Sequence, residues 1–226
     1  MSMKWRQAVL APHSMRLVPA RYLPLVGMLL GAIGGAVYWL AAPLWPSSVA
    51  VVLSLFAIAW LSGNMSENSF ARLSLLWTDL FVLLVKYNVL MALTAANLGF
   101  SVPANVTLGL IMVCGQAASR ALLVSVLAVR TSSAETRARA ADKGGTQPPP
   151  HPSSQDLIVS LVLGFAPAAL LGIPGLMGLA GAIIMRIGLG PYVKRNSSSA
   201  RALLNTVQQS TEVCFYLGAL ATWKYI

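Results

Sequence analysis

The sequence predicts an all-α, polytopic integral membrane protein with about seven transmembrane helices. Of its 226 residues, 57% are hydrophobic and only 10% are charged, whereas soluble domains carry about 25% charged residues. The mean hydropathy is +0.71, and apolar runs approach the roughly 20 residues that a membrane helix needs. A soluble fold is excluded, because so few polar side chains cannot cover a chain of this size in water.

Seven apolar segments are candidates for membrane helices. The fifth and sixth are nearer to about 15 residues each, short for a full crossing. Only Gly172-Ile173-Pro174-Gly175 separates them, so they either cross fully or form a re-entrant hairpin. The predicted segments are Leu23–Ala42, Val49–Leu61 (extendable to Ser47 and Gly63), Leu75–Ala95, Ala104–Val129, Leu157–Leu171, Leu176–Leu189 and Val207–Trp223.

Lysine and arginine alternate between the predicted connections. From the segment before the first helix to the stretch 186–201, they number 4, 0, 1, 0, 4, 0 and 4. Positive charge accumulates on cytoplasmic segments of membrane proteins. The pattern therefore predicts a cytoplasmic N-terminus and an external C-terminus. Orientation explains most of the net charge of +10 without nucleic acid, and an added attraction for anionic lipids or phosphorylated substrates stays open.

Composition divides the chain into three parts. Residues 1–130 contain an N-terminal cytoplasmic segment and four of the predicted helices, and residues 157–226 contain the other three. Residues 131–156 between them are rich in proline and serine and include Pro148-Pro149-Pro150. Such a composition buries too little apolar surface to fold alone. We therefore expect a cytoplasmic linker there, extended or disordered.

A few ionisable residues fall within the predicted membrane segments, where burying a charge is costly. Asp79 and Lys86 lie in the third segment, Arg120 in the fourth and Glu212 in the seventh. Gln208 precedes Glu212 by four residues and so shares its helix face. These residues predict a polar interior between the three helices. It is either a structural network of charge pairs or a substrate cavity.

The two ends of the chain resemble the cobalamin synthase family, the adenosylcobinamide-GDP ribazoletransferases. The run Arg21–Gly31, followed by Val37–Leu40, resembles the opening of that family. The segment Gln208–Leu217 is similar to its C-terminal Gln-Gln-x-Ser-Glu helix. Lys86, which closes an apolar run, and Ser119-Arg120, in a helix rich in glycine and alanine, fit the order of the family's elements.

The resemblance implies a multi-pass enzyme of the bacterial inner (cytoplasmic) membrane, with its C-terminus in the periplasm. Such enzymes act in cobalamin (vitamin B12) biosynthesis: they join adenosylcobinamide-GDP to α-ribazole or its 5′-phosphate, use Mg²⁺ and release GMP. Other membrane enzymes of the same pathway are the implied partners. The implied residues are Glu67 and Asn68 for catalysis, Lys86, Arg120, Gln208 and Gln209 for substrate binding, and Glu67 and Glu212 for Mg²⁺.

The acidic motifs of the family are incomplete here. The family places His-Glu-Asp-Gly-Leu-x-Asp-x-x-Asp after its second helix, and Ser62–Arg72 stands in that place. Glu67 keeps the glutamate, but Asn68 replaces the first aspartate and Arg72 the second. A second acidic motif is replaced by Ser197–Ala202. Because Mg²⁺ prefers carboxylate oxygens, this loop alone cannot assemble a two-metal site.

Two other interpretations therefore stay open. The first is a catalytically impaired paralogue that binds corrinoid intermediates or a partner membrane protein. The second is a small transporter, suggested by the charges at membrane depth but less favoured, because the chain has no clear inverted repeat.

Overall fold

The chain is all-helical in the part that its computed structural model describes, residues 19–62, 73–95, 104–141, 153–195 and 200–222. Side chains are described for these residues except 73–79, 104–105, 130–141, 194–195 and 200–202. No strand occurs in the described ranges. The elements are η2 (Ala20–Tyr22), α2 (Leu23–Ala41), α3 (Ser47–Leu61), α4 (Leu73–Ala95), α5 (Ala104–Ala141), α6 (Ser154–Leu170), α7 (Ile173–Gly188), α8 (Gly190–Arg195) and α9 (Ala200–Ala221).

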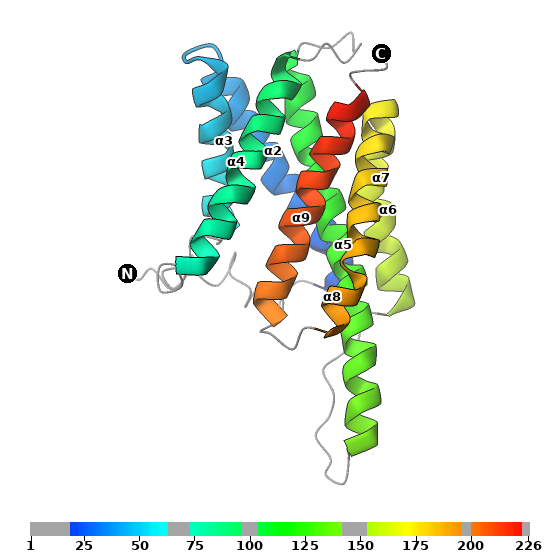
Figure 1. Cartoon of the computed structure of the whole chain (residues 1–226). Helices are drawn as coiled ribbons and strands as arrows, with labels where there is room; N and C mark the ends of the chain where they lie inside the picture. Colours follow the sequence, from blue (N-terminus) through cyan, green and yellow to red (C-terminus); the bar gives the residue numbers. More distant parts are fainter. Residues whose placement is uncertain (1–18, 63–72, 96–103, 142–152, 196–199, 223–226) are drawn as a thin grey trace, which may run out of the picture.

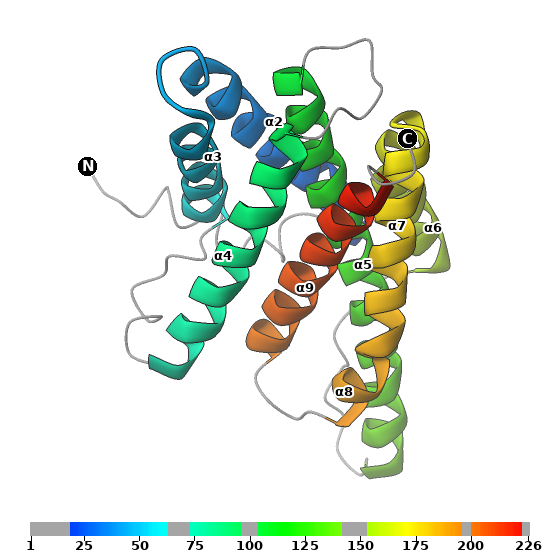
Figure 2. The ribbon, with the colours of Figure 1, turned by 45° about the horizontal axis from the view of Figure 1, so that its top comes forward.

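The helices form a bundle around α5. Helices α2, α6 and α9 pack directly on α5, α3 packs on α2, and α7 pairs with α9. Figure 1 shows α3 and α4 on one side of α5 and α6 and α7 on the other, and Figure 2 keeps the same arrangement in a tilted view. The residues predicted to form a polar interior lie on α4, α5 and α9, which contact one another.

Glycines allow α2 to approach α5 closely. A Cβ atom added at Gly31 would lie 2.5 Å from Cα of Val113, and one at Gly35 would lie 2.9 Å from Cα of Gly109. Real side chains do not make such short contacts with backbone, so the two helices touch backbone to backbone. The glycine face of α2 is a helix-packing surface.

The short pair of helices is a tight hairpin. Helix α6 begins with a capping box, in which the Asp156 amide donates to Ser153 Oγ and the Ser153 amide donates to an Asp156 carboxylate oxygen, both at 3.1 Å. It ends at Leu170, and α7 begins at Ile173. Gly172 between them has φ +68°, a conformation that favours glycine. The predicted break between the fifth and sixth segments is confirmed.

Helix α5 is longer than predicted. It continues through residues 131–141, the first part of the segment expected to be an extended or disordered linker. That expectation was wrong for these residues. The sequence Ala134-Glu135-Thr136-Arg137-Ala138-Arg139-Ala140-Ala141 is rich in strong helix formers, and Glu135 precedes Arg139 by four residues, a favourable spacing. At 38 residues, α5 measures about 57 Å from its rise per residue, longer than a bilayer core.

The outer surface of the bundle is apolar. Leu170 is 88% exposed, and Ile184, Phe81 and Leu29 are also strongly exposed. Soluble monomers rarely present so much contiguous apolar surface. In the described ranges, two segments are long and apolar enough to cross a membrane, Ala20–Ala41 and Val106–Val129; Ser47–Leu61, Leu80–Ala95, Ser154–Leu170 and Ile173–Gly188 are shorter apolar helices.

Candidate functional site: a buried charged cluster between α4, α5 and α9

A buried ion pair joins α4 to α9. Lys86 Nζ lies 2.8 Å from Glu212 Oε2, and the two side chains are 6% and 1% exposed. Lys86 Nζ also donates a hydrogen bond to Gln209 Oε1, one turn before Glu212 on α9. Such burial is costly unless the charges are paired and hydrogen-bonded, so the pair holds α4 and α9 in a fixed relation.

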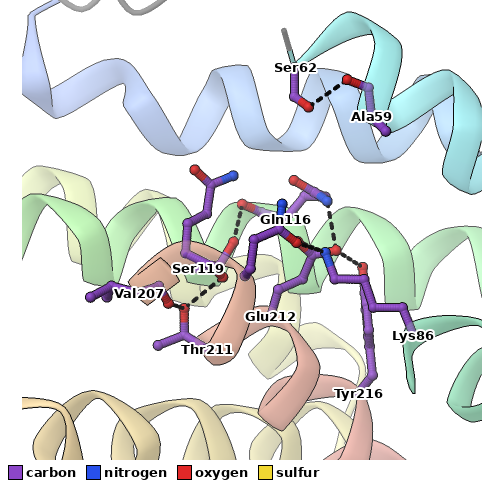
Figure 3. Close-up of polar contacts among 11 residues, drawn as sticks. Ala59, Ser62, Lys86, Gln116, Ser119, Val207, Thr211, Glu212 and Tyr216 are labelled. Atoms are coloured by element: carbon purple, nitrogen blue, oxygen red, sulfur yellow. Dashed lines mark hydrogen bonds and ion pairs between the residues drawn. The ribbon is translucent and has the colours of Figure 1, made fainter. Parts of the chain in front are cut away.

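Glu212 is the centre of the cluster. Gln116 on α5 donates from Nε2 to Glu212 Oε1 at 2.8 Å, and the Tyr216 hydroxyl donates to the same oxygen at 3.0 Å. With Lys86 on the other oxygen, both carboxylate oxygens are occupied by donors. Figure 3 shows Lys86, Gln116 and Tyr216 converging on Glu212 from three helices. The carboxylate is therefore fixed in orientation.

A glycine on α5 makes room for one of these donors. A Cβ at Gly115 would lie 2.9 Å from Cζ of Tyr216. Without that atom, α9 can bring the Tyr216 ring against α5 and its hydroxyl onto Glu212. Glycine, which has no side chain, thus allows the close packing of α2 on α5 and also the hydrogen bond from Tyr216 to Glu212.

Arg120 adds a second buried cation. It follows Gln116 by one turn of α5, is 8% exposed, and is close enough to Glu212 for electrostatic attraction. Its Nε has no hydrogen-bond partner among the described residues. A Cβ at Gly27 of α2 would lie 2.8 Å from Arg120 Cδ, so the glycine leaves space for the arginine stem.

The buried charges do not balance. Among the described residues, the buried side chains of the cluster that carry a full charge are Lys86, Arg120 and Glu212, two cations and one anion. Neighbouring hydroxyls do not change this balance. Ser119 Oγ donates to the Gln116 carbonyl at 3.1 Å and Thr211 Oγ1 to the Val207 carbonyl at 2.7 Å, each within its own helix (Figure 3). The described part of the cluster is thus electropositive, inside an apolar bundle.

The structure gathers most of the predicted residues that it describes. Lys86, Arg120 and Glu212 come together, as the polar-interior prediction required. Gln209, which the resemblance implied for substrate binding, joins them through its contact with Lys86. Gln208 is half-buried on α9, and its backbone carbonyl accepts a hydrogen bond from Thr211 Oγ1 at 3.0 Å. Glu67, Asn68 and the side chain of Asp79 lie outside the described residues.

Sequence reasoning missed Gln116 and Tyr216. Both carried a detectable signal, since Gln116 is an amide one helical turn before Arg120 in an apolar helix, and Tyr216 follows Glu212 by four residues. Gln116 lies outside the runs that carried the resemblance to a family. Tyr216 lies within one of them, Gln208–Leu217, but after its Gln-Gln-x-Ser-Glu motif, so neither residue was selected.

The described residues do not fit the predicted magnesium site. Both oxygens of Glu212 are taken up by Lys86, Gln116 and Tyr216. No group of three His, Cys, Asp or Glu side chains able to hold a metal occurs in the described ranges. A cation beside Glu212 would also face the positive charges of Lys86 and Arg120. We therefore derive no chemical step through a metal at Glu212.

An all-helical bundle with an apolar exterior and charges buried at its centre is the architecture of a polytopic membrane protein with an internal polar site. A family model described as cobalamin-5-phosphate synthase matches residues 6–71. This N-terminal part of the chain is thus similar to the cobalamin synthase family.

Curated relatives extend the match. A segment of 52 residues, 23% of this chain and 20% of the relative, is 50% identical to the adenosylcobinamide-GDP ribazoletransferase of Leptothrix cholodnii. A longer match covers 133 residues, which is 48% of this chain and 49% of each relative. Over this length the chain is 32% identical to the adenosylcobinamide-GDP ribazoletransferases of Ralstonia pickettii and Ralstonia nicotianae. The matches thus span at most about half the length of these relatives. No solved structure matches the chain.

Proposed function

We propose that this chain is a membrane protein of cobalamin biosynthesis whose buried cluster binds the phosphates of a nucleotide-activated corrinoid. One observation carries the proposal: among the described residues, the cluster has two buried cations, Lys86 and Arg120, against one carboxylate, Glu212. The relatives are named for adenosylcobinamide-GDP, whose diphosphate carries negative charge. An electropositive centre in an apolar bundle supports binding of such an anion.

Each residue has a role that follows from its contacts. Arg120 has a donor nitrogen, Nε, without a partner in the part of the chain that the structure describes, and its planar guanidinium matches two phosphate oxygens at once. Lys86 is held by Glu212 and Gln209 and contributes positive charge from a fixed position. Glu212 orients Lys86, Gln116 and Tyr216 and touches no substrate. Gln208, half-buried one residue before Gln209, serves at the rim of the site.

The reaction we propose is that of the relatives' name, transfer of a ribazole group onto adenosylcobinamide-GDP with release of GMP. In such a phosphoryl transfer, positioning and charge stabilisation supply most of the catalysis. Arg120 and Lys86 would stabilise the charge that develops on the departing GMP. Magnesium remains part of the proposal only through Glu67 and Asn68, which lie in the family-matched segment 6–71.

The proposed setting is the bacterial inner membrane, with seven crossings, a cytoplasmic N-terminus and a periplasmic C-terminus. Two facts support it: the alternation of Lys and Arg along the sequence, and the alternating direction of α2, α3, α4, α5, α6, α7 and α9 in the bundle (Figure 1). Two basic stretches of the sequence include the end of α5 and helix α8. These two elements lie together at one end of the bundle.

A direct assay tests the function. Purified protein is incubated with adenosylcobinamide-GDP, α-ribazole and Mg²⁺, and GMP is quantified by chromatography beside an active homologue. We expect GMP release that requires both substrates. Binding of adenosylcobinamide-GDP without any GMP release would remove the catalytic part of the proposal and keep the binding part.

A catalytically impaired paralogue is the second candidate. It is favoured by Asn68 and Arg72, which stand in place of two acids of the family motif. It would bind corrinoid intermediates or a partner membrane protein. Complementation of a strain that lacks its own cobalamin synthase decides between the two, because growth supported by the unmodified chain eliminates the impaired paralogue. If the unmodified chain fails, Asn68→Asp alone is expected to fail as well, since several acids are missing.

A further inference from the structure

The Gln116 side chain has a fixed orientation. Its Nε2 donates to Glu212 Oε1 at 2.8 Å, and an ionised carboxylate can only accept hydrogen bonds. The amide nitrogen must therefore face Glu212, and the amide oxygen must face away from it. The side chain is 1% exposed, so it has no freedom to turn toward solvent.

Two polar atoms of opposite kind, one helical turn apart on α5, have no partner within the described ranges. Gln116 Oε1, an acceptor, and Arg120 Nε, a donor, are both buried without a hydrogen-bond partner among the described residues. Residues four apart on a helix lie on the same face, with a rise of about 6 Å between them. Because buried polar groups in proteins are nearly always hydrogen-bonded, these two atoms define a binding preference.

The preference is chemically specific. A phosphate oxygen accepts hydrogen bonds, so it satisfies Arg120 but is repelled by the amide oxygen of Gln116. A hydroxyl group donates, so it satisfies Gln116. A ligand that satisfies both atoms carries a phosphate and a hydroxyl about one helical turn apart, as a ribose phosphate does.

We infer that Gln116 is a specificity-determining residue whose side-chain oxygen accepts a hydrogen bond from a ribose hydroxyl, beside the phosphate that Arg120 binds. The inference rests on the proposed function, which supplies two ribose-bearing groups, the GDP moiety of one substrate and the ribazole of the other. Both offer the same chemistry, so the experiment contains an arm for each.

The experiment measures binding by isothermal titration calorimetry with the full chain in detergent micelles. The first arm compares GDP with 2′,3′-dideoxy-GDP, the second compares α-ribazole 5′-phosphate with its 2′,3′-dideoxy form, and pyrophosphate reports the phosphate contact alone. For the wild-type chain, we expect about tenfold weaker binding of the dideoxy compound in one arm, which corresponds to about 1.4 kcal/mol. The arm that shows the difference identifies the source of the ribose.

Two variants separate hydroxyl recognition from support of Glu212. Gln116→Leu removes the amide oxygen and also the hydrogen bond to Glu212 Oε1. Tyr216→Phe removes a hydrogen bond to the same Glu212 oxygen and leaves the Gln116 oxygen in place. We expect the preference for the hydroxyl to fall to about twofold or less in Gln116→Leu and to persist in Tyr216→Phe. Pyrophosphate is titrated into both variants, so that the preference for the hydroxyl is compared at a known phosphate affinity. Gln116→Met serves if the leucine variant does not fold.

Each other outcome has a distinct meaning. If the wild-type chain binds pyrophosphate but does not distinguish any dideoxy compound, a water molecule satisfies Gln116 and the inference is wrong, while the proposed function stands. If both variants lose the preference equally, Gln116 only supports Glu212, and the inference is again wrong. If the wild-type chain binds neither pyrophosphate nor GDP, the proposed phosphate site itself is wrong.

Discussion

Helix α5 presents two very different surfaces to its neighbours. Toward α2 it offers backbone at Val113 and Gly109, against which the glycines of α2 pack without intervening side chains. Toward α4 and α9 it offers Gln116, beside the Lys86–Glu212 ion pair. Arg120, one turn on, is attracted by Glu212, and its stem lies against Gly27 of α2. In an apolar environment the first surface is stabilised by van der Waals contact. The second is stable only while its charges and donors are matched.

The difference concerns what each surface tolerates. A close-packed apolar surface fails when an atom is added, since there is no space for it. A buried polar surface fails when a partner is removed, since the remaining group is left unpaired. The apolar surface should therefore be sensitive to substitutions that add atoms, and the polar surface to substitutions that remove a partner.

The largest effect is expected for Glu212→Ala. It leaves Lys86 buried without its counter-charge, and breaking a buried ion pair costs about 3–5 kcal/mol. We expect a large fall in the thermal unfolding temperature in detergent, or no monodisperse protein. The matched control is Lys86→Met with Glu212→Leu, which removes both charges and should recover much of the loss. If Glu212→Ala is as stable as the wild type, the Lys86–Glu212 ion pair does not hold α4 to α9.

Arg120→Met should separate binding from stability. Arg120 is buried, and its Nε has no described partner, so its removal should leave the unfolding temperature unchanged or higher. Pyrophosphate binding should weaken by about tenfold to a hundredfold, since charged hydrogen bonds contribute about 1.5–3 kcal/mol. Arg120→Lys keeps the charge but loses the planar guanidinium. Its pyrophosphate affinity should lie between those of the wild type and Arg120→Met. Unchanged pyrophosphate affinity in Arg120→Met would place the phosphate contact elsewhere.

Gly31→Ala tests the apolar surface by adding an atom. Its Cβ would lie 2.5 Å from Cα of Val113, and backbone cannot move aside as a flexible side chain can. Overpacking of this kind costs about 1–3 kcal/mol, measured as a lower unfolding temperature. Gly188→Ala is the control, because nothing lies within 4 Å of its added Cβ. Equal effects of the two substitutions would mean that helix propensity, rather than the α2–α5 contact, sets the result.

The same contrast explains how far the sequence alone could lead. Apolar runs located the six helices from α2 to α7, because membrane-length hydrophobic segments are a one-dimensional property. The cluster was only partly accessible: Lys86, Arg120 and Glu212 were marked as charges at membrane depth, but their pairing depends on how α4, α5 and α9 are arranged in space. The assignment of Glu212 to magnesium came from family motifs, and its geometry shows a carboxylate already surrounded by donors.

The smallest effect is expected for Tyr216→Phe. This variant tests whether the hydrogen-bond donors around Glu212 contribute independently to stability. The substitution removes one neutral donor from Glu212 Oε1, while Gln116 still donates to that oxygen and Lys86 to the other. A single hydrogen bond of this kind contributes about 0.5–1.5 kcal/mol, so the unfolding temperature should fall only slightly. The ring remains in place against Gly115, and the α5–α9 packing is therefore retained. A loss as large as that of Glu212→Ala would mean that the donors around Glu212 act as one cooperative unit, in which the ion pair depends on the tyrosine hydroxyl.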